Sequence, residues 1–291
     1  MSKKLLVTGI SGFLGSHLAK NHPKSWQIIG TYAHNASQFP GVECLQLDLE
    51  KQDSVIDLIQ VSKPDAVFHF AALSNANYCE QNPAASYNIN VAASKLLAKT
   101  CHSLSIPFLF TSTDLIFDGQ YAPYKETDIP QPVNVYGRHK LEAERSILNI
   151  YPTAIIARLP LLYGLVPERK NFFEQWIETL KKGAMINAFS DEYRSIADAD
   201  SVIEGLFLLM DSSAKGIWHL GGKERISRYD FAMKMAAAFQ LPTTQINETL
   251  QSNIDLVAAR PADVSLDSSR AFALGYNPSM LEDALAAIRL R

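Results

Sequence analysis

The chain has 291 residues, of which 47% are hydrophobic and 20% charged, and its formal net charge is −3 at pH 7. Such a composition is that of a globular protein with a full core. The nearly balanced charge excludes the basic footprint of a protein that binds nucleic acid or an anionic membrane surface. No run approaches the ~18 apolar residues of a membrane span, so we expect no membrane segment.

The three cysteines, Cys44, Cys79 and Cys101, are widely spaced and odd in number, which fits neither a metal site nor a disulfide framework. The sequence enters its first apolar run within a few residues, without the pattern of a signal peptide. We therefore expect a cytoplasmic protein with reduced cysteines and no metal site.

Residues 3–9, KKLLVTG, predict a short buried parallel strand, and a helical pattern follows it. Gly9, Gly12 and Gly15 lie between the two in a G-x-x-G-x-x-G spacing, which differs from the commoner G-x-G-x-x-G. Such a turn lets the backbone approach a pyrophosphate, which the N–H groups of the helix N-terminus can bind. Glycines also occur in tight turns without a ligand, but the strand–turn–helix context favours a dinucleotide site.

The end of the second strand, predicted at 26–35, bears on the choice of cofactor. An acidic residue there would bind the ribose 2′-hydroxyl and repel a 2′-phosphate. Residues 31–37 contain neither an acidic residue nor an arginine, and the missing repulsion favours NADP(H) over NAD(H). LQLDL (45–49) is predicted to end a third strand, and Asp48 within it either faces the adenine or starts the next helix.

Strands and helices continue to alternate along the chain, which predicts a doubly wound, Rossmann-like parallel sheet with helices on both faces. Further strands are expected at 65–73, 106–113 and 153–164, and helices at 83–103, 133–150, 171–182, 198–211 and 227–240. We expect a dinucleotide-binding domain at 1–164. Residues 165–291 are expected to form a smaller, mainly substrate-binding part, with some segments returning to the Rossmann core.

Tyr136 and Lys140 are four residues apart in the helix predicted at 133–150, so they share one helix face. A free tyrosine has a pKa of about 10, and a nearby ammonium group would lower it and make proton transfer easier. Ser112, Thr113 and Asp114 end the fifth strand, where ligands of such sheets bind. An exposed helix pair is the alternative for the tyrosine and lysine, but the dinucleotide fold favours a catalytic pair.

These residues resemble those of the extended short-chain dehydrogenase/reductase family and, within it, the dTDP-4-dehydrorhamnose reductases. The resemblance covers most of the chain and is carried by TGISGFLGSHL (8–18), STDLIFDG (112–119), YGRHKLEAE (136–144), RLPLLYG (158–164) and RPADVSLDSSR (260–270). The family's catalytic serine or threonine, tyrosine and lysine match Thr113, Tyr136 and Lys140.

The resemblance implies reduction of a 4-keto nucleotide sugar, with hydride from the nicotinamide and a proton from Tyr136. The expected cofactor contacts are Gly9, Gly12, Phe13, Leu14, Gly15, Asp48, Leu49, Ala71, Ala72, Tyr136 and Lys140. The expected substrate contacts are Ser112, Asp114, Arg194 and Arg260. The two arginines suit a diphosphate, and surface salt bridges are their alternative. Asn90 is expected to brace the active-site backbone.

Two other functions remain open. One is a nucleotide-sugar epimerase or 4,6-dehydratase, although Leu115 follows Asp114, where a dehydratase needs a second carboxylate. The other is a non-enzymatic dinucleotide-binding regulator, a role that the beta subunit of methionine adenosyltransferase has on a similar sequence plan. By analogy alone, we also expect a homodimer formed through the two long helices.

Overall fold

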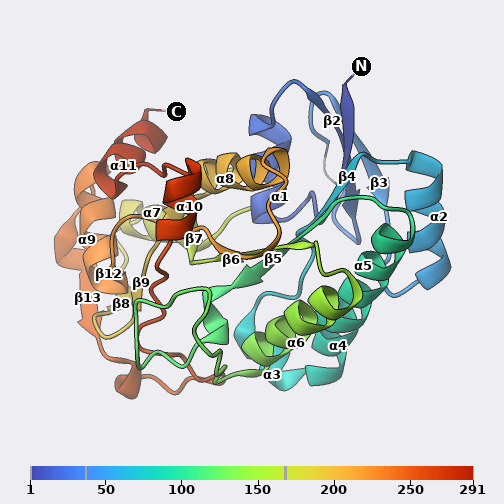
Figure 1. The fold of residues 1–291 in the computed structure, drawn as a ribbon. Helices are drawn as coiled ribbons and strands as arrows, with labels where there is room; N and C mark the ends of the chain where they lie inside the picture. Colours follow the sequence, from blue (N-terminus) through green and yellow to red (C-terminus); the bar gives the residue numbers. More distant parts are fainter. Residues whose placement is uncertain (1, 37, 167–168, 291) are drawn as a thin grey trace.

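The computed structural model describes residues 2–36, 38–166 and 169–290. Its central sheet has the strand order β11-β6-β5-β4-β1-β2-β3, and every pairing in it is parallel (Figure 1). The strands are β1 (Lys3–Thr8), β2 (Trp26–Tyr32), β3 (Val42–Gln46), β4 (Ala66–His69), β5 (Phe108–Thr113), β6 (Ile155–Leu159) and β11 (Gly216–His219). The predicted Rossmann-like α/β fold is confirmed.

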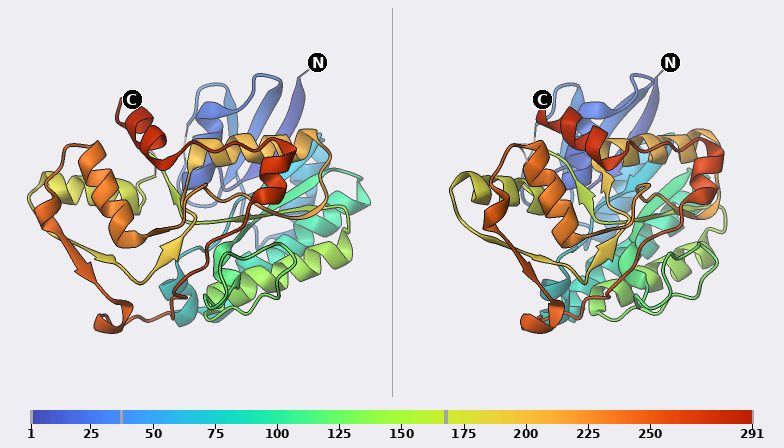
Figure 2. Two further views of the ribbon diagram at one scale, coloured as in Figure 1. Left: turned by 60° about the vertical axis from the view of Figure 1, so that its left-hand side comes forward. Right: turned by 90° about the vertical axis from the view of Figure 1, so that its left-hand side faces the viewer.

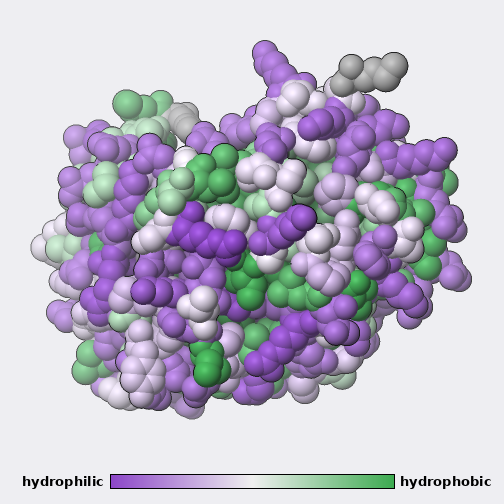
Figure 3. All heavy atoms as spheres, viewed as in Figure 1, coloured by the Kyte–Doolittle hydropathy of each residue, from purple (hydrophilic) through white to green (hydrophobic). Residues whose placement is uncertain are grey.

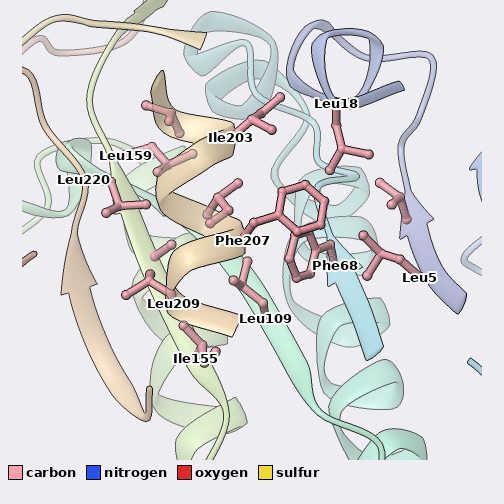
Figure 4. Packing of buried hydrophobic residues seen from close by; sticks show 14 of the residues in the cluster. Leu5, Leu18, Phe68, Leu109, Ile155, Leu159, Ile203, Phe207, Leu209 and Leu220 are labelled. Carbon is pink, nitrogen blue, oxygen red and sulfur yellow. The ribbon is translucent and has the colours of Figure 1, made fainter. Parts of the chain in front are cut away.

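Helices cover both faces of this sheet, because alternate side chains of each strand point to opposite faces. On one face, Leu5 and Phe68 pack under α1 (Phe13–Asn21) and α8 (Ala199–Asp211). Figure 4 shows Phe207 of α8 against Phe68, with ring centroids 5.4 Å apart. On the other face, Leu6 and Val67 pack under α2 (Gln52–Ser62), α5 (Ser94–Ser103) and α6 (Val135–Ile150). These two hydrophobic cores hold the strands of the sheet in place from both faces, and with them the strand ends at which ligands of such sheets bind.

A second, smaller group of elements lies beside the sheet, as Figure 2 shows. It is built around an aromatic-rich core that includes Phe173, Phe231 and Met235. Its helices are α7 (Phe172–Lys181), α9 (Arg228–Ala238) and α11 (Leu281–Arg289). Its strand pairs are β7 (Leu162–Tyr163) with β10 (Ala197–Asp198), β8 (Ile186–Phe189) with β13 (Ile246–Thr249), and β9 (Tyr193–Arg194) with β12 (Ile226–Ser227).

The single helix predicted at 83–103 is wrong in detail. The chain forms α4 (Pro83–Tyr87), a π-helical turn η1 (Asn88–Ala93) and α5, and the unpredicted α3 (Ala76–Gln81) precedes them. The wide turn contains Asn90, whose side-chain amide bonds both backbone groups of Leu73. A tertiary contact therefore accompanies the departure from regular α-helix, as is common for π-turns at functional sites.

The third strand, Val42–Gln46, ends within the predicted 45–49 segment, before Asp48. The chain turns at Asp48, whose carboxylate accepts from the N–H of Glu50 at 3.0 Å and whose carbonyl accepts from the N–H of Lys51 at 3.1 Å. These two bonds form the turn that leads from the end of β3 into α2. The sixth strand, predicted at 153–164, is divided between β6 and β7.

The remaining short elements are η2 (Asp114–Ile116), η3 (Thr243–Gln245), η4 (Gln251–Asn253) and α10 (Ser269–Leu274). Polar side chains cover most of the face in Figure 3, with apolar residues gathered near its middle. Within the described parts of the chain, no helix combines the length and apolar character needed to cross a membrane.

Candidate active site

The glycine turn after β1 fits a bound pyrophosphate. Gly9 has a φ of 76°, and a Cβ built on it would lie 2.8 Å from the backbone of Ala71. A Cβ on Gly15 would lie 2.3 Å from the carbonyl oxygen of Gly9, so neither position tolerates a side chain. A Cβ on Gly12, by contrast, would meet only the carbonyl oxygen of Gly9, at 3.1 Å, and would otherwise face open space. It is the N-cap of α1 and provides no side-chain cap, which leaves the helix N–H groups available to an anion.

The end of β4 is tied to the same turn. The N–H of Ala71 donates to the hydroxyl of Thr8 at 3.3 Å, and that hydroxyl also lies 2.6 Å from Nδ1 of His69. The pKa of His69 is lowered to about 3, mainly by burial and further by the charge of Lys140. Nε2 of His69 contacts Ser94, so this histidine is a neutral packing residue.

Asn90 braces the loop after β4, as expected. Its Oδ1 accepts from the N–H of Leu73 at 2.9 Å, and its Nδ2 donates to the carbonyl oxygen of Leu73 at 3.0 Å. The loop at the edge of the cofactor region is thus fixed by one buried amide.

Helix α6 begins directly beside the end of β5. Asn134 caps it by accepting from the N–H of Gly137 at 2.9 Å, and its amide donates to the carbonyl oxygen of Ala259 at 3.0 Å. A Cβ on Gly137 would lie 2.2 Å from the carbonyl oxygen of Leu115. The glycine therefore allows α6 to pack against η2, which brings Tyr136 to the strand end.

Thr113, Tyr136 and Lys140 lie together in the buried space that this packing creates. Thr113 interacts with the phenol of Tyr136 and lowers its pKa. The ammonium nitrogen of Lys140 lies 3.8 Å from the centre of the Phe110 ring. The structure thus brings together the three residues predicted to be catalytic.

Burial dominates the electrostatics of this cluster. Burial raises the pKa of Tyr136 well above its ordinary value, the charges of Asp114 and Cys79 raise it further, and the interaction with Thr113 lowers it. Burial therefore determines the pKa of Tyr136 in the protein without a cofactor, and the lowering predicted for Lys140 together with an oxidised nicotinamide stays a prediction. Burial lowers the pKa of Lys140 to about 7, although Glu144 acts in the opposite direction.

Asp114 connects the cluster to the C-terminal part. Its Oδ1 accepts from the Thr113 hydroxyl at 3.2 Å, and its Oδ2 lies 3.4 Å from Nε of Arg194. Arg194 also pairs with Glu192 at 3.1 Å. Burial raises the pKa of Asp114 to about 6, and Arg194 partly offsets this. Arg194 is itself buried, so it forms an internal ion pair and is neither a surface bridge nor an open phosphate ligand.

Ser112 precedes Thr113 and is also buried. Its hydroxyl has no hydrogen-bond partner among the described residues. An unpaired polar atom at a strand end is costly unless a ligand or water satisfies it, so Ser112 suits a substrate contact.

Arg260 lines a pocket of about 150 Å³, whose other lining residues are Trp176, Asn187, Ala188, Phe189, Glu192, Arg228 and Leu256. Arg228 was missed because it belongs to no recognised motif. Its guanidinium lies 4.2 Å from the ring centre of Phe172 and 4.7 Å from that of Trp176. Its pKa is lowered to about 10, mainly by burial, while Glu192 raises it. The pocket therefore offers two arginines to an anionic ligand.

The adenine side of the site is less enclosed. Asp48 is exposed and caps the turn before α2, whereas Leu49 is buried against that helix. Residues 33–36 beyond β2 are exposed and contain no carboxylate, and Ser37 lies outside the described residues. Within those same residues, no group of three or more His, Cys, Asp or Glu side chains could hold a metal ion.

Comparison with known proteins places this site in a family. The model of the RmlD substrate binding domain matches residues 3–288. A probable low-salt glycan biosynthesis reductase from Haloferax volcanii is 31% identical, with 97% of this chain and 96% of the relative covered. Methionine adenosyltransferase 2 subunit beta from Rattus norvegicus is also 31% identical, with 94% of this chain and 83% of the relative covered.

Two solved structures have the same fold. A dTDP-4-dehydrorhamnose reductase from Bacillus anthracis, in complex with NADP, superposes with a TM-score of 0.89 at 22% identity over 100% of this chain and 99% of that chain. A hypothetical dTDP-4-dehydrorhamnose reductase from Sulfolobus tokodaii gives a TM-score of 0.84 at 31% identity over 96% and 98%. The chain therefore belongs to the RmlD substrate binding domain family and has the extended short-chain dehydrogenase/reductase fold.

Proposed function

We propose that the chain is an NAD(P)H-dependent oxidoreductase that reduces the 4-keto group of a nucleotide sugar. Family membership and the fold support the oxidoreductase class. The observation that carries the proposal is the burial of Thr113, Tyr136 and Lys140 where α6 packs against the end of β5, with Lys140 one turn beyond Tyr136 on α6.

The protonation states of the cluster suit reduction. A nicotinamide cofactor, when bound, supplies the hydride. Tyr136 has a raised pKa and is therefore a neutral phenol at pH 7, which can donate its proton to the carbonyl oxygen as that oxygen gains negative charge. Thr113 interacts with the same phenol and would orient the substrate oxygen. Ser112 and Asp114 would contact the sugar.

The pocket around Arg260 would hold the nucleotide diphosphate. Arg260 and Arg228 line one side of it, and a permanently charged planar guanidinium matches a phosphate well. For the cofactor, Gly9, Gly12 and Gly15 would bind the pyrophosphate. The lack of a carboxylate in residues 33–36 favours NADP(H) over NAD(H).

The test is turnover with a dTDP-4-keto-6-deoxy sugar, followed as oxidation of NADPH and, separately, of NADH. Tyr136→Phe should lower turnover by about 10²–10⁴-fold, because the proton donor is lost, while calorimetry should show cofactor binding near the parent level. Tyr121→Phe is the matched control, since Tyr121 is 75% exposed. Turnover near the parent level in Tyr136→Phe would show that the proton-donor assignment is wrong.

A regulatory role is the second candidate, favoured by the 31% identity to methionine adenosyltransferase 2 subunit beta. A wild-type chain that binds NADPH tightly but oxidises it with none of the 4-keto sugars tested would support that role. The epimerase or dehydratase alternative is weaker, because Leu115 occupies the position of a second carboxylate after Asp114. Conversion of the sugar without net oxidation of NADPH would favour it.

A further inference from the structure

Three buried polar side chains lie along one face of α6. Tyr136, Lys140 and Glu144 follow each other at four-residue intervals, and all three are buried. Residues four apart on a helix are neighbours on its surface, so Glu144 lies one helical turn beyond Lys140. The reaction proposed above uses the first two residues and leaves Glu144 without a role.

Arg158 of β6 holds the Glu144 carboxylate in a fixed orientation. Its Nε lies 3.1 Å and 3.2 Å from the two carboxylate oxygens of Glu144, and its Nη2 lies 2.8 Å from Oε2. Both side chains are 2% exposed or less. A bidentate pair of this kind fixes direction as well as distance, so the carboxylate cannot change its orientation without breaking the pair.

His219 of β11 fixes the other end of Arg158. Nδ1 of His219 lies 3.1 Å from the carbonyl oxygen of Tyr124 and 3.2 Å from that of Asp267. Carbonyl oxygens only accept, so Nδ1 carries the proton, and Nε2 accepts from Nη1 of Arg158 at 3.3 Å. Burial, and next the charge of Arg158, lower the pKa of His219 to about 3, which agrees with this neutral tautomer.

Among the charged and titratable groups that face α6, those other than Glu144 do not raise the pKa of Lys140. His69 of β4 is neutral, and Asp114 after β5 acts on Tyr136 and pairs with Arg194. On α3, Cys79 acts on Tyr136, and Glu80 accepts from the N–H of Val135 and pairs with Arg138. On the α4 side, Ser86 bonds His139. The charge that raises the pKa of Lys140 is that of Glu144.

On the basis of the function proposed above, we infer that Glu144 is a positioning residue of the reaction. Its carboxylate, held by Arg158, keeps the Lys140 ammonium charged beside Tyr136. A charged lysine stabilises the phenolate left after proton donation, and a neutral lysine does not. Arg158 and His219 act through Glu144 and touch none of the reacting groups.

The first test measures Lys140 directly in the cofactor-free protein. Lysine labelled with ¹³C at Cε gives one NMR signal per residue, and the Lys140 signal is assigned by its loss in Lys140→Met. The titration midpoint of that signal is compared in the wild type, in Glu144→Gln and in the double variant Glu144→Gln/Arg158→Met. The double variant is needed because Glu144→Gln leaves Arg158 buried and unpaired and can fail to fold, whereas loss of both charges is better tolerated. Glu142→Gln, which removes an exposed carboxylate from the same helix, is the control.

We expect the Lys140 midpoint to fall by about one pH unit or more in the variants that lack Glu144, because a nearby opposite charge shifts a pKa by about 1–3 units. It should stay unchanged in Glu142→Gln. An unchanged midpoint in the folded double variant would overturn the inference.

The second test is the pH profile of kcat/KM in the keto-sugar assay. The limb that reports loss of the lysine proton should move to lower pH in the double variant by the same amount as the NMR midpoint. A midpoint that falls while this limb stays in place would show that Glu144 has no part in catalysis. If the wild type shows no turnover, the proposed function fails, and the positioning role fails with it even where the NMR midpoint falls.

Discussion

Asp114 influences the protonation of Tyr136. The Asp114 charge raises the pKa of Tyr136, while burial raises the pKa of Asp114 itself to about 6. At neutral pH the pair therefore consists of an ionised carboxylate and a neutral phenol. Arg194 favours this state, because its guanidinium stabilises the carboxylate in a space that is otherwise apolar.

This burial has a consequence for stability. Between pH 3.8 and about 6 the folded protein retains a proton on Asp114 that the unfolded chain has lost, so the free energy of unfolding falls as the pH rises through this window. Asp114→Asn removes this dependence. Relative to the wild type, its free energy of unfolding should increase by about 3 kcal/mol between pH 4 and 6 and then stay constant. Urea titrations at four pH values would measure it, with the exposed Asp57→Asn as control. Parallel curves for Asp114→Asn and the wild type would contradict the placement of this carboxyl group.

At the level of elements, the hydrogen bonds in the segment between β5 and α6 give a structural reason for the F-D-G at 117–119 and the tyrosine at 124. The Tyr124 hydroxyl accepts from the N–H groups of Gly119, Gln120 and Tyr121 and donates to Asp118 at 2.5 Å. The Tyr124 backbone also bonds the segment at 265–267. The F-D-G and following tyrosine are thus a clamp that positions the 260–267 segment, and they need not touch a ligand themselves.

Local rules predicted α6 well. The helix predicted at 133–150 is α6, which spans Val135–Ile150 and so begins within two residues of the predicted start. The ion pair between Asp114 and Arg194 could not be predicted. It joins residues eighty positions apart and depends on the pairing of β9 with β12 and on a bond from Tyr193 N–H to the carbonyl oxygen of Ala262. Sequence spacing carries no information on such a contact.

Gly137→Ala tests whether the close packing of α6 on the end of β5 matters for catalysis as well as for stability. The added Cβ would lie 2.2 Å from the Leu115 carbonyl oxygen, so α6 must move away from the end of β5. A shift of α6 by about 1 Å would misplace Tyr136, and a misplacement of this size costs about 10²-fold in kcat. Gly205→Ala is the matched control, because its Cβ would lie 2.8 Å from the Tyr276 ring, within α8 and outside the Thr113–Tyr136–Lys140 cluster. Both variants should lose about 1–3 kcal/mol of stability. Equal kcat values in the two variants would mean that the close packing of α6 has no catalytic purpose.

On the scale of the whole molecule, the two ligand regions lie on different parts of the fold. The glycine turn follows β1 of the central sheet, whereas Arg260 lines a pocket formed by the smaller C-terminal group of elements. Glu192 lines this pocket and also pairs with Arg194, which in turn holds Asp114. One chain of buried charges therefore runs from the pocket around Arg260 to the Thr113–Tyr136–Lys140 cluster.

Because the two regions are separate, a substitution in the Arg260 pocket should weaken binding of dTDP without weakening binding of NADPH. Arg260→Ala removes one of two guanidiniums from the pocket, and a charged hydrogen bond contributes about 1.5–3 kcal/mol, so the Kd for dTDP should rise by about 10- to 100-fold. The Kd for NADPH should stay near the parent value. Arg225→Ala is the control, since this arginine pairs with Asp263 and stacks on Tyr193 outside the lining of the pocket. Calorimetric titration of each variant with both ligands measures all four constants. If Arg260→Ala weakened NADPH binding as much as dTDP binding, the two sites would not be separate, and if it left dTDP binding unchanged, the diphosphate would lie elsewhere.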